Sequence, residues 1–421
     1  MHAPASKHGL YISYNGMLDP LGQSQVLPYL KELSKFGWQF TLLSYERAHA
    51  YTDEGQQHCR RLADELMHFD IDWHYLRYHQ RPSLPATAYD VTAGIRYASR
   101  LLKHRQVDLV HARAQIAAVI ALALKRRFGP KMIFDVRGLM AEEYIDAGHW
   151  REGSMASRVT KAGERRAFAG ADGVVTLTER IWPIIKEWEG LRDRNVAHEV
   201  IPCCADLQRF RFSSDTREHC RRALGITDGF VLIYSGSIDG WYLTEEMADF
   251  FATFARKKPN ALFLWLTQSS RERIEAVMRA RNIDGSSFKI VAAPPEDVPK
   301  YLAAGDAGLA FIKPCFSKLA SSPTKYAEYL GCGLPLVINA GIGDSDTLIT
   351  QHNCGVLIQR FAETDYAEAI DQLDKFTANP AATRSAMHKV AELLFDLNDV
   401  GVARYARLYQ RLVSEGSQGK S

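Results

Sequence analysis

Short apolar runs alternate with helix-like segments along almost the whole chain. The first runs are GLYISYN, FTLLSYE and VDLVHAR, and segments with helical spacing of apolar residues, such as Leu21–Phe36, stand between them. Such runs are typical of parallel strands with both faces covered, because a parallel connection needs a crossover helix. The alternation therefore predicts an α/β protein built on doubly wound, Rossmann-like parallel sheets.

The alternation comes in two series. The polar stretch Asp206–Glu218 interrupts the first series, and a second begins at FVLIYSG and continues through LFLWLT, FKIVAA and AGLAFIK. With 421 residues, 46% of them hydrophobic, the chain is long enough for two domains with separate cores. We expect a first domain at residues 1–205, a second at 206–397 and a terminal helical segment at 398–421. Because parallel sheets bind ligands at the carboxyl ends of their strands, two facing sheets would form a cleft for two substrates.

Composition and charge narrow the classes of function. The net charge is +3, with no concentrated basic face, which does not suggest a nucleic-acid binder. No run of roughly 18 apolar residues is present, and the first residues lack the apolar region of a signal peptide. The seven cysteines are scattered without a CxxC pair, which favours a reduced, cytoplasmic protein with no zinc site.

The stretch ASSPTKYAEYLGCGLPLV, residues 320–337, carries the clearest chemical signal. Ser322, Pro323 and Thr324 precede a helix on which Lys325 stands one turn before Glu328. Backbone N–H groups at a helix start bind phosphate, and a carboxylate one turn on can accept ribose hydroxyls. The pattern suits a nucleoside diphosphate. A capped helix with a surface lysine is the structural alternative.

Other nucleotide motifs are missing from the sequence. No GxGxxG follows the first strand and no GxxxxGK[ST] occurs, which argues against a nicotinamide or flavin enzyme and against a P-loop nucleotidase. Two DxD patterns, Asp70-Ile71-Asp72 and Asp344-Ser345-Asp346, could in principle hold a metal ion. We interpret both as chance occurrences and expect no metal site.

The layout around Lys325 and Glu328 resembles the donor site of group 1, or family 4, glycosyltransferases of the bacterial polysaccharide-assembly type, which adopt the GT-B fold. The resemblance covers the whole chain and is strongest over Phe230–Leu357. It implies a nucleotide-sugar donor as substrate, no cofactor and no metal, and a terminal helix that crosses back onto the first domain. The donor-binding residues that it implies are Gly22, Ser237, Pro295, Ser322, Pro323, Thr324, Lys325, Glu328, Gly341 and Gly343.

Two positions depart from the family pattern. Many relatives carry Gly-Arg after the first strand of the second domain, with a lysine nearby, whereas this chain has Ser237 and no such lysine. The charge of the leaving diphosphate would then be stabilised by Lys325, the helix start and the Gly22 loop. Many relatives also carry a histidine where this chain has Arg137. A structural ion pair with a nearby glutamate is the alternative role for Arg137.

These observations predict a glycosyltransferase that moves a sugar, with retention, from a UDP- or GDP-sugar to a glycan or lipid-linked acceptor in surface polysaccharide or glycoconjugate synthesis. The candidate catalytic residues are Arg137, His111 and Lys325. A nucleotide-sugar epimerase on the same fold, using Glu142, Glu143 and His111, stays open, as does a non-catalytic nucleotide-sugar-binding subunit. Basic clusters also leave open a peripheral contact with the inner face of the membrane.

Overall fold

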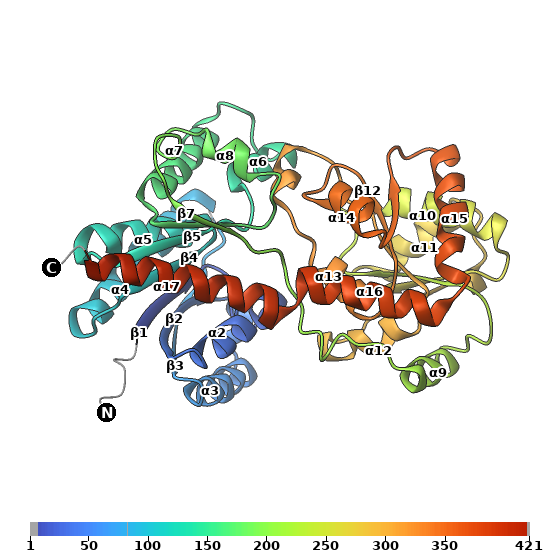
Figure 1. The fold of residues 1–421 in the computed structure, drawn as a ribbon, viewed down its shortest axis with the longest axis horizontal. Coiled ribbons are helices and arrows are strands. Elements are labelled where there is room, and N and C mark those ends of the chain that lie inside the picture. Colours follow the sequence, from blue (N-terminus) through green and yellow to red (C-terminus); the bar gives the residue numbers. More distant parts are fainter. Residues whose placement is uncertain (1–6, 82, 419–421) are drawn as a thin grey trace. The chain divides into compact units, whose positions relative to one another are not determined.

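The computed structural model describes residues 7–81 and 83–418 and divides into two compact units (Figure 1). Unit 1 comprises Met1–Pro202 and Leu397–Ser421, and unit 2 comprises Cys203–Asp396. Each unit contains one sheet in which all neighbouring strands are parallel. The prediction of two doubly wound α/β units is therefore confirmed. No helix within the described ranges is both long and apolar enough to cross a bilayer.

Unit 1 has a seven-stranded sheet in the order β3-β2-β1-β4-β5-β6-β7. Its strands are β1 (Lys7–Ser13), β2 (Trp38–Glu46), β3 (Ile71–Arg77), β4 (Leu109–Arg113), β5 (Lys131–Asp135), β6 (Gly173–Thr176) and β7 (Ala197–Val200). Its helices include α1 (Pro20–Gln25), α2 (Leu27–Ser34), α3 (Asp53–Met67), α4 (Ser83–His104), α5 (Ala114–Phe128), α6 (Met140–Asp146), α7 (Met155–Gly170), α8 (Trp182–Lys186) and α17 (Ala403–Gln418). The strand order reverses at β1, so the loops that follow β1 and β4 diverge at a switch point where such sheets bind ligands.

The predicted helix Leu21–Phe36 is two helices in the structure. Helix α1 ends at Gln25 and α2 begins at Leu27, with Val26 outside helical geometry between them. Pro28 lies in the first turn of α2, where its missing N–H leaves no bond unmade. In a continuous helix the same proline would clash with the carbonyl four residues earlier, which explains the break.

Unit 2 has a six-stranded sheet in the order β10-β9-β8-β11-β12-β13. Its strands are β8 (Val231–Ser235), β9 (Leu262–Leu266), β10 (Phe288–Val291), β11 (Ala307–Ala310), β12 (Leu336–Asn339) and β13 (Gly355–Ile358). Its helices are α9 (Ser214–Ala223), α10 (Thr244–Lys257), α11 (Arg271–Arg279), α12 (Val298–Ala303), α13 (Thr324–Gly331), α14 (Ser345–His352), α15 (Glu363–Thr377) and α16 (Pro380–Phe395).

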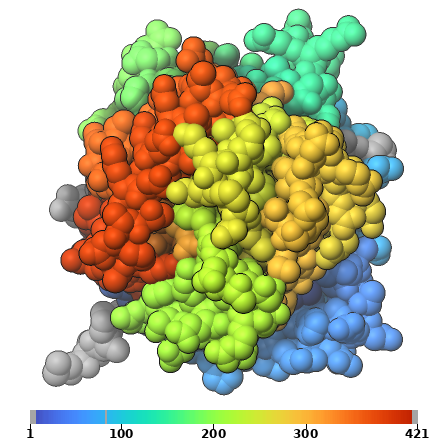
Figure 2. Space-filling model, turned by 90° about the vertical axis from the view of Figure 1, so that its right-hand side faces the viewer, coloured from blue at the N-terminus to red at the C-terminus, as the bar shows by residue number. Residues whose placement is uncertain are grey.

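Two hydrophobic cores cover the two faces of the unit 2 sheet. Val231 and Ile233 belong to one core, and their neighbours Leu232 and Tyr234 belong to the other, because successive side chains of a strand point to opposite faces. Figure 2 looks onto the outer surface of this unit, where α10 (yellow) and α15 (orange-red) lie side by side although they are distant in the sequence. This double covering explains why the strands are apolar throughout.

The terminal helix α17 is part of unit 1. Tyr405 on α17 donates a hydrogen bond to Asp135 at the end of β5, with 3.0 Å between the oxygens. The hydroxyl of Tyr409, one turn later, lies 2.6 Å from Nδ1 of His111 on β4. Both tyrosines are buried. The last helix therefore completes the core of the unit that contains the first residues of the chain.

Candidate functional site

Lys325 is a buried cation at the start of α13. Its side chain is only 4% exposed, so the surface-lysine alternative does not hold. The ammonium group lies 3.7 Å from the centroid of the Tyr242 ring and 4.4 Å from that of Tyr234, and it is 3.3 Å from the Tyr234 hydroxyl oxygen. Aromatic faces attract a cation most strongly where water is excluded. The two tyrosines thus hold a largely desolvated positive charge.

The loop after β8 passes directly beside this charge. A Cβ added to Gly236 would lie 3.0 Å from the Lys325 ammonium nitrogen, and Gly236 has a φ of +133°, so a glycine is required there. The loop is fixed by two tyrosine hydroxyls: Tyr329 accepts a bond from the Ser235 N–H at 2.7 Å, and Tyr234 donates to the Ser237 carbonyl. Lys325 therefore places its charge at the loop that contains Ser237, where the family pattern would have arginine.

Glu328 stands one turn after Lys325 and is partly buried. Burial lowers the pKa of the Lys325 ammonium group to about 7, although the nearby Glu328 carboxylate opposes this shift. Burial also raises the pKa of Glu328, opposed by the positive charges of Lys325 and Arg209. Each group is thus less readily ionised than in water, and an anionic ligand would favour the charged lysine.

Arg209 connects Glu328 to the loop that contains Pro295. Its guanidinium group donates a hydrogen bond to the Pro295 carbonyl and lies close enough to Glu328 to lower the pKa of that carboxyl. The sequence prediction missed Arg209 because it falls in the polar stretch that separates the two series of strands. The structure thus brings Pro295, Arg209 and Glu328 together at one side of the Lys325 site.

The start of α13 is open to an anion. Pro323 is its N-terminal boundary residue, and none of the described side chains caps the helix there. Ser322 is engaged elsewhere, because its hydroxyl accepts a hydrogen bond from the Cys203 N–H at 3.2 Å. Thr324 begins the helix. The Ser322 hydroxyl can still donate its proton, so this hydroxyl and the backbone N–H groups of the helix start are the donors available to a phosphate.

The loop after β12 is bonded to the backbone of a second buried lysine, Lys318. Gly341 and Gly343 both have positive φ angles, +84° and +46°. The Gly343 N–H donates to the carbonyl of Lys318 at 2.8 Å, and the Lys318 ammonium group lies 3.9 Å from the centroid of the Trp241 ring. Lys318 is 7% exposed. It lies in a short 3-10 helix, Phe316–Ala320, and no periodic pattern in the sequence pointed to it.

Gly22 has a packing role in the structure. A Cβ on this residue would lie 2.3 Å from the Gly16 carbonyl oxygen and 2.7 Å from the Met17 Cα, so only glycine lets α1 pack on this loop. The loop is held by Glu46, a carboxylate with no exposed surface that accepts bonds from the Met17 N–H at 2.6 Å and the Ser44 hydroxyl at 2.7 Å. The requirement for glycine at position 22 thus follows from packing alone. Contact with a donor phosphate stays a prediction.

His111 lies inside unit 1, which does not agree with the prediction that it faces a reacting sugar. The ring is 2% exposed, with Nδ1 at 2.6 Å from the Tyr409 hydroxyl and Nε2 at 3.4 Å from Asp135 Oδ2. Burial lowers the pKa of His111, so the ring is neutral near pH 7. Both nitrogens are engaged inside the core, so His111 is removed from the candidate catalytic residues. The epimerase alternative loses its histidine for the same reason.

Arg137 pairs with Asp135, the last residue of β5. A guanidinium nitrogen lies 3.5 Å from Asp135 Oδ1, and another lies 3.5 Å from Gln25 Oε1 on α1. Burial alone would raise the pKa of Asp135, but Arg137 and His111 lower it to about 2, so the carboxylate is charged at neutral pH. Arg137 is thus held at the carboxyl end of β5, next to the loop after β1.

The two DxD patterns have protein partners. Asp72 is paired with Arg105 at 2.9 Å and with His74 at 3.2 Å. Asp346 accepts a hydrogen bond from the Gly341 N–H at 3.2 Å. Within residues 7–81 and 83–418, no three His, Cys, Asp or Glu side chains gather closely enough to hold a metal ion. Asp72 and Asp346 are therefore engaged by protein groups.

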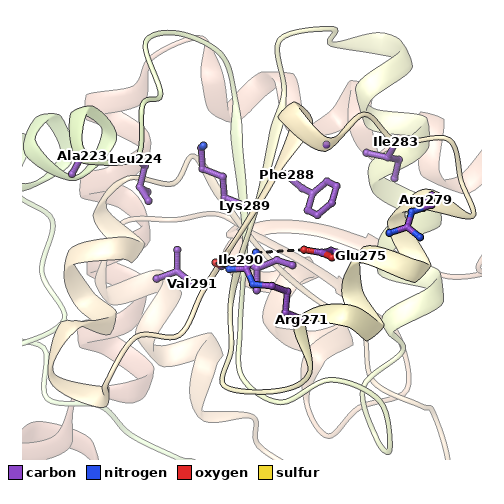
Figure 3. A pocket seen from close by; sticks show the side chains of 11 residues that line it. Ala223, Leu224, Arg271, Glu275, Arg279, Ile283, Phe288, Lys289, Ile290 and Val291 are labelled. Carbon is purple, nitrogen blue, oxygen red and sulfur yellow. Dashed lines mark hydrogen bonds and ion pairs between the residues drawn. The ribbon is translucent and has the colours of Figure 1, made fainter.

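A separate hollow of about 670 Å³ lies along the edge strand β10 (Figure 3). Arg271 and Glu275 of α11 form an ion pair at one side, with 3.5 Å between nitrogen and oxygen, and Arg271 also donates to the Ile290 carbonyl of β10 at 2.8 Å. None of the predicted site residues lines this hollow. Arg271 thus covers part of an edge that would otherwise present open hydrogen-bonding groups.

Comparison with known proteins identifies the fold. Residues 22–204 match the family described as glycosyl transferase 4-like domain. Among solved structures, sucrose-phosphate synthase from Thermosynechococcus elongatus is 15% identical, with a TM-score of 0.74, covering 97% of this chain and 100% of that one. Anabaena Alr3699/HepE in complex with UDP is 15% identical, with a TM-score of 0.67 and coverages of 98% and 100%.

A third similar structure is WaaG, a glycosyltransferase involved in lipopolysaccharide biosynthesis, which is 16% identical with a TM-score of 0.65 and covers 96% of this chain and 98% of that one. No protein of curated function matched the sequence. The fold is that of the GT-B glycosyltransferases. The family match lies almost entirely within unit 1, and over the rest of the chain the likeness is one of fold.

Proposed function

We propose that unit 2 binds a UDP- or GDP-sugar at the Lys325 site and that the enzyme transfers the sugar to a glycan or lipid-linked acceptor in surface polysaccharide or glycoconjugate synthesis. The observation that carries the proposal is the buried Lys325 ammonium group. It lies between two tyrosine rings, beside the Gly236 backbone and one turn from Glu328. A desolvated cation next to a helix N-terminus is suited to a diphosphate.

Similar structures support the nucleotide part of the proposal. Alr3699/HepE was solved with UDP, with UDP and glucose, and with UDP-glucose. Involvement of WaaG in lipopolysaccharide biosynthesis supports a role for this chain in surface glycan assembly. A lipid-linked acceptor would bring the enzyme to the inner face of the membrane from the cytoplasm.

The chemistry that follows is departure of a nucleoside diphosphate. In the proposed step, the bond from the sugar C1 to the β-phosphate oxygen breaks, the acceptor oxygen bonds to C1 from the same face, and the proton of the acceptor hydroxyl passes to the leaving diphosphate. Lys325 and the backbone N–H groups at the start of α13 stabilise the charge that develops on the diphosphate. Glu328 accepts hydrogen bonds from the ribose hydroxyls, and the Pro295 loop lies against the base. The Gly341 and Gly343 loop lies near the donor sugar.

Gly22, Ser237 and Arg137 have smaller parts in the proposal. Gly22 and Arg137 stand at carboxyl ends of unit 1 strands, where a ligand is expected. The Ser237 N–H belongs to the loop beside Lys325. No side chain of the enzyme needs to act as nucleophile in this scheme.

The test is donor turnover by Glu328→Ala and Lys325→Ala, with Glu275→Ala in the separate hollow as the matched control. We expect both site variants to lose at least about 10-fold in turnover at subsaturating donor, because each removes a charged partner of the nucleotide. The control should retain normal turnover. Full turnover in both site variants would show that the donor site is elsewhere.

A further inference from the structure

A second histidine–aspartate pair lies at the carboxyl ends of β1 and β3 in unit 1. Asp90, on α4, is 1% exposed and is the centre of the cluster. Its Oδ2 accepts hydrogen bonds from the Tyr14 hydroxyl at 2.8 Å and from the His79 backbone N–H at 3.0 Å. Its Oδ1 lies 2.6 Å from Nδ1 of the His79 ring. Three bonds thus fix this carboxylate and the ring that it holds.

The outward side of the His79 ring is available to a ligand. Because the Asp90 carboxylate accepts, Nδ1 carries a proton, and Nε2 is the ring nitrogen left for a ligand. The side chain is 40% exposed. Within residues 7–81 and 83–418, no hydrogen bond to Nε2 is present. The ring is therefore a fixed hydrogen-bond acceptor with access to solvent.

His79 differs from His111 in the surroundings of its second ring nitrogen. The other histidine of this sheet also contacts a buried aspartate, but its second nitrogen bonds to the Tyr409 hydroxyl inside the core. For His79, the backbone N–H and Tyr14 already satisfy one oxygen of Asp90, and the Tyr45 hydroxyl holds the Asp90 carbonyl at 2.8 Å. The second nitrogen of His79, in contrast, lies outside this set of core hydrogen bonds.

Aromatic rings lie close to the His79–Asp90 pair. Tyr89 is 63% exposed, and its ring lies edge-on to the His79 ring, with 5.1 Å between centroids and an angle of 87°. The rings of Tyr14 and Tyr78 lie 5.3 Å apart next to the same carboxylate. Sugar rings present C–H groups on their faces and hydroxyls at their edges. An exposed aromatic ring beside a fixed acceptor matches both features.

We propose that His79, Asp90 and Tyr89 form a subsite for a sugar ring of the acceptor, in which His79 Nε2 accepts a hydrogen bond from a hydroxyl and Tyr89 packs on the C–H face. The inference rests on the proposed function, because a sugar at this place is meaningful when the enzyme joins a donor sugar to a glycan. Asp90 acts as a positioning residue that sets the tautomer and orientation of the ring.

The test uses the full chain on an array of immobilised mono- and oligosaccharides, in the presence of millimolar UDP or GDP. The variants are His79→Gln and Tyr89→Ala, both at side chains with solvent access, so that folding is preserved. The matched controls are His58→Gln and Phe36→Ala, at exposed positions of the same unit. We expect the wild-type protein to bind a subset of the saccharides. Its affinity for them should fall roughly 5- to 10-fold in each site variant, because each variant loses about one hydrogen bond or ring contact.

Two results would overturn the inference: wild-type protein that binds no saccharide, or site variants that bind as the controls do. Thermal shifts with UDP and GDP on the same preparations separate this failure from failure of the proposed function. A nucleotide shift without saccharide binding rejects the subsite and keeps the donor site. Saccharide binding that depends on His79 without any nucleotide shift supports the subsite and rejects the donor assignment.

Discussion

The Lys325 ammonium group lies 3.7 Å from the centre of the Tyr242 ring, inside unit 2 and out of contact with bulk water. Tyr242 comes from the loop after β8 and Lys325 from the start of α13, so the contact joins the two loops where a nucleotide is proposed to bind. Aromatic faces hold a cation without neutralising it. The arrangement thus keeps a positive charge ready for an anion.

Nucleoside diphosphate affinity should depend on pH through Lys325. The pKa of about 7 means that the ammonium form, which attracts phosphate, is lost as pH rises through 7 in the unliganded protein. We expect affinity measured by titration calorimetry to fall between pH 6 and pH 9. The variant Lys325→Met, which keeps the side-chain length, should bind at least about 10-fold more weakly at pH 6 and show a flatter profile. An identical profile in the two proteins would contradict the assignment.

Glu328 should contribute through its charge and its two oxygens. Glu328→Gln keeps the shape but removes the charge, so hydrogen bonds from ribose hydroxyls weaken by about 1–2 kcal/mol, or roughly 5- to 30-fold in Kd. Calorimetry with nucleoside and 2′-deoxynucleoside diphosphates measures this directly. The preference for ribose should shrink in the variant, and a variant that keeps the full preference would show that Glu328 does not contact ribose.

Tyr409→Phe should destabilise unit 1. The change leaves the His111 Nδ1 without its partner in the core, and an unsatisfied buried polar group costs about 1–3 kcal/mol. Urea unfolding should show a lower midpoint with an unchanged slope. The control Tyr89→Phe removes an exposed hydroxyl and should leave the midpoint unchanged. Equal midpoints for the wild type, Tyr409→Phe and Tyr89→Phe would contradict the hydrogen bond between Tyr409 and the buried His111 ring.

Glu164 should make stability depend on pH. Burial raises its pKa to about 8, with a further contribution from Glu142, against an ordinary value of 4.5. The folded state therefore holds a proton that the unfolded state releases, and the stabilisation, on the order of 5 kcal/mol, is present below pH 4.5 and lost as pH rises towards 8. Glu164→Gln should flatten this decline in urea midpoints relative to wild type, whereas the exposed Glu187→Gln should not.

The strands and most helices could be predicted because each depends on a local pattern. The break at Val26 was missed because the apolar spacing of Leu21–Phe36 runs across it, although Pro28 carried the signal. The position of Lys325 on a helix, one turn from Glu328, could likewise be predicted from the local sequence. Its burial between Tyr234 and Tyr242 could not, because those tyrosines are more than 80 residues away in the sequence.

In unit 1, too, contacts between residues distant in the sequence could not be predicted from local patterns. His111 lies on a strand whose two faces look alike in sequence, and the helix that seals its ring is almost 300 residues further along the chain. His79 and Asp90 are separated by the loop after β3 and by the first turns of α4, with no repeat that relates them. Contacts of this kind follow from the topology of the sheet, which local patterns do not contain.

The most direct test of the central claim is calorimetric titration of the full chain with UDP, GDP, ADP and CMP, in parallel with Lys325→Met. We predict that the wild type binds UDP or GDP, with saturation at one site per chain, and that the variant loses at least about 10-fold in affinity. Binding of no nucleotide by the wild type, or equal affinity in the two proteins, would contradict the assignment of the Lys325 site to the nucleotide-sugar donor.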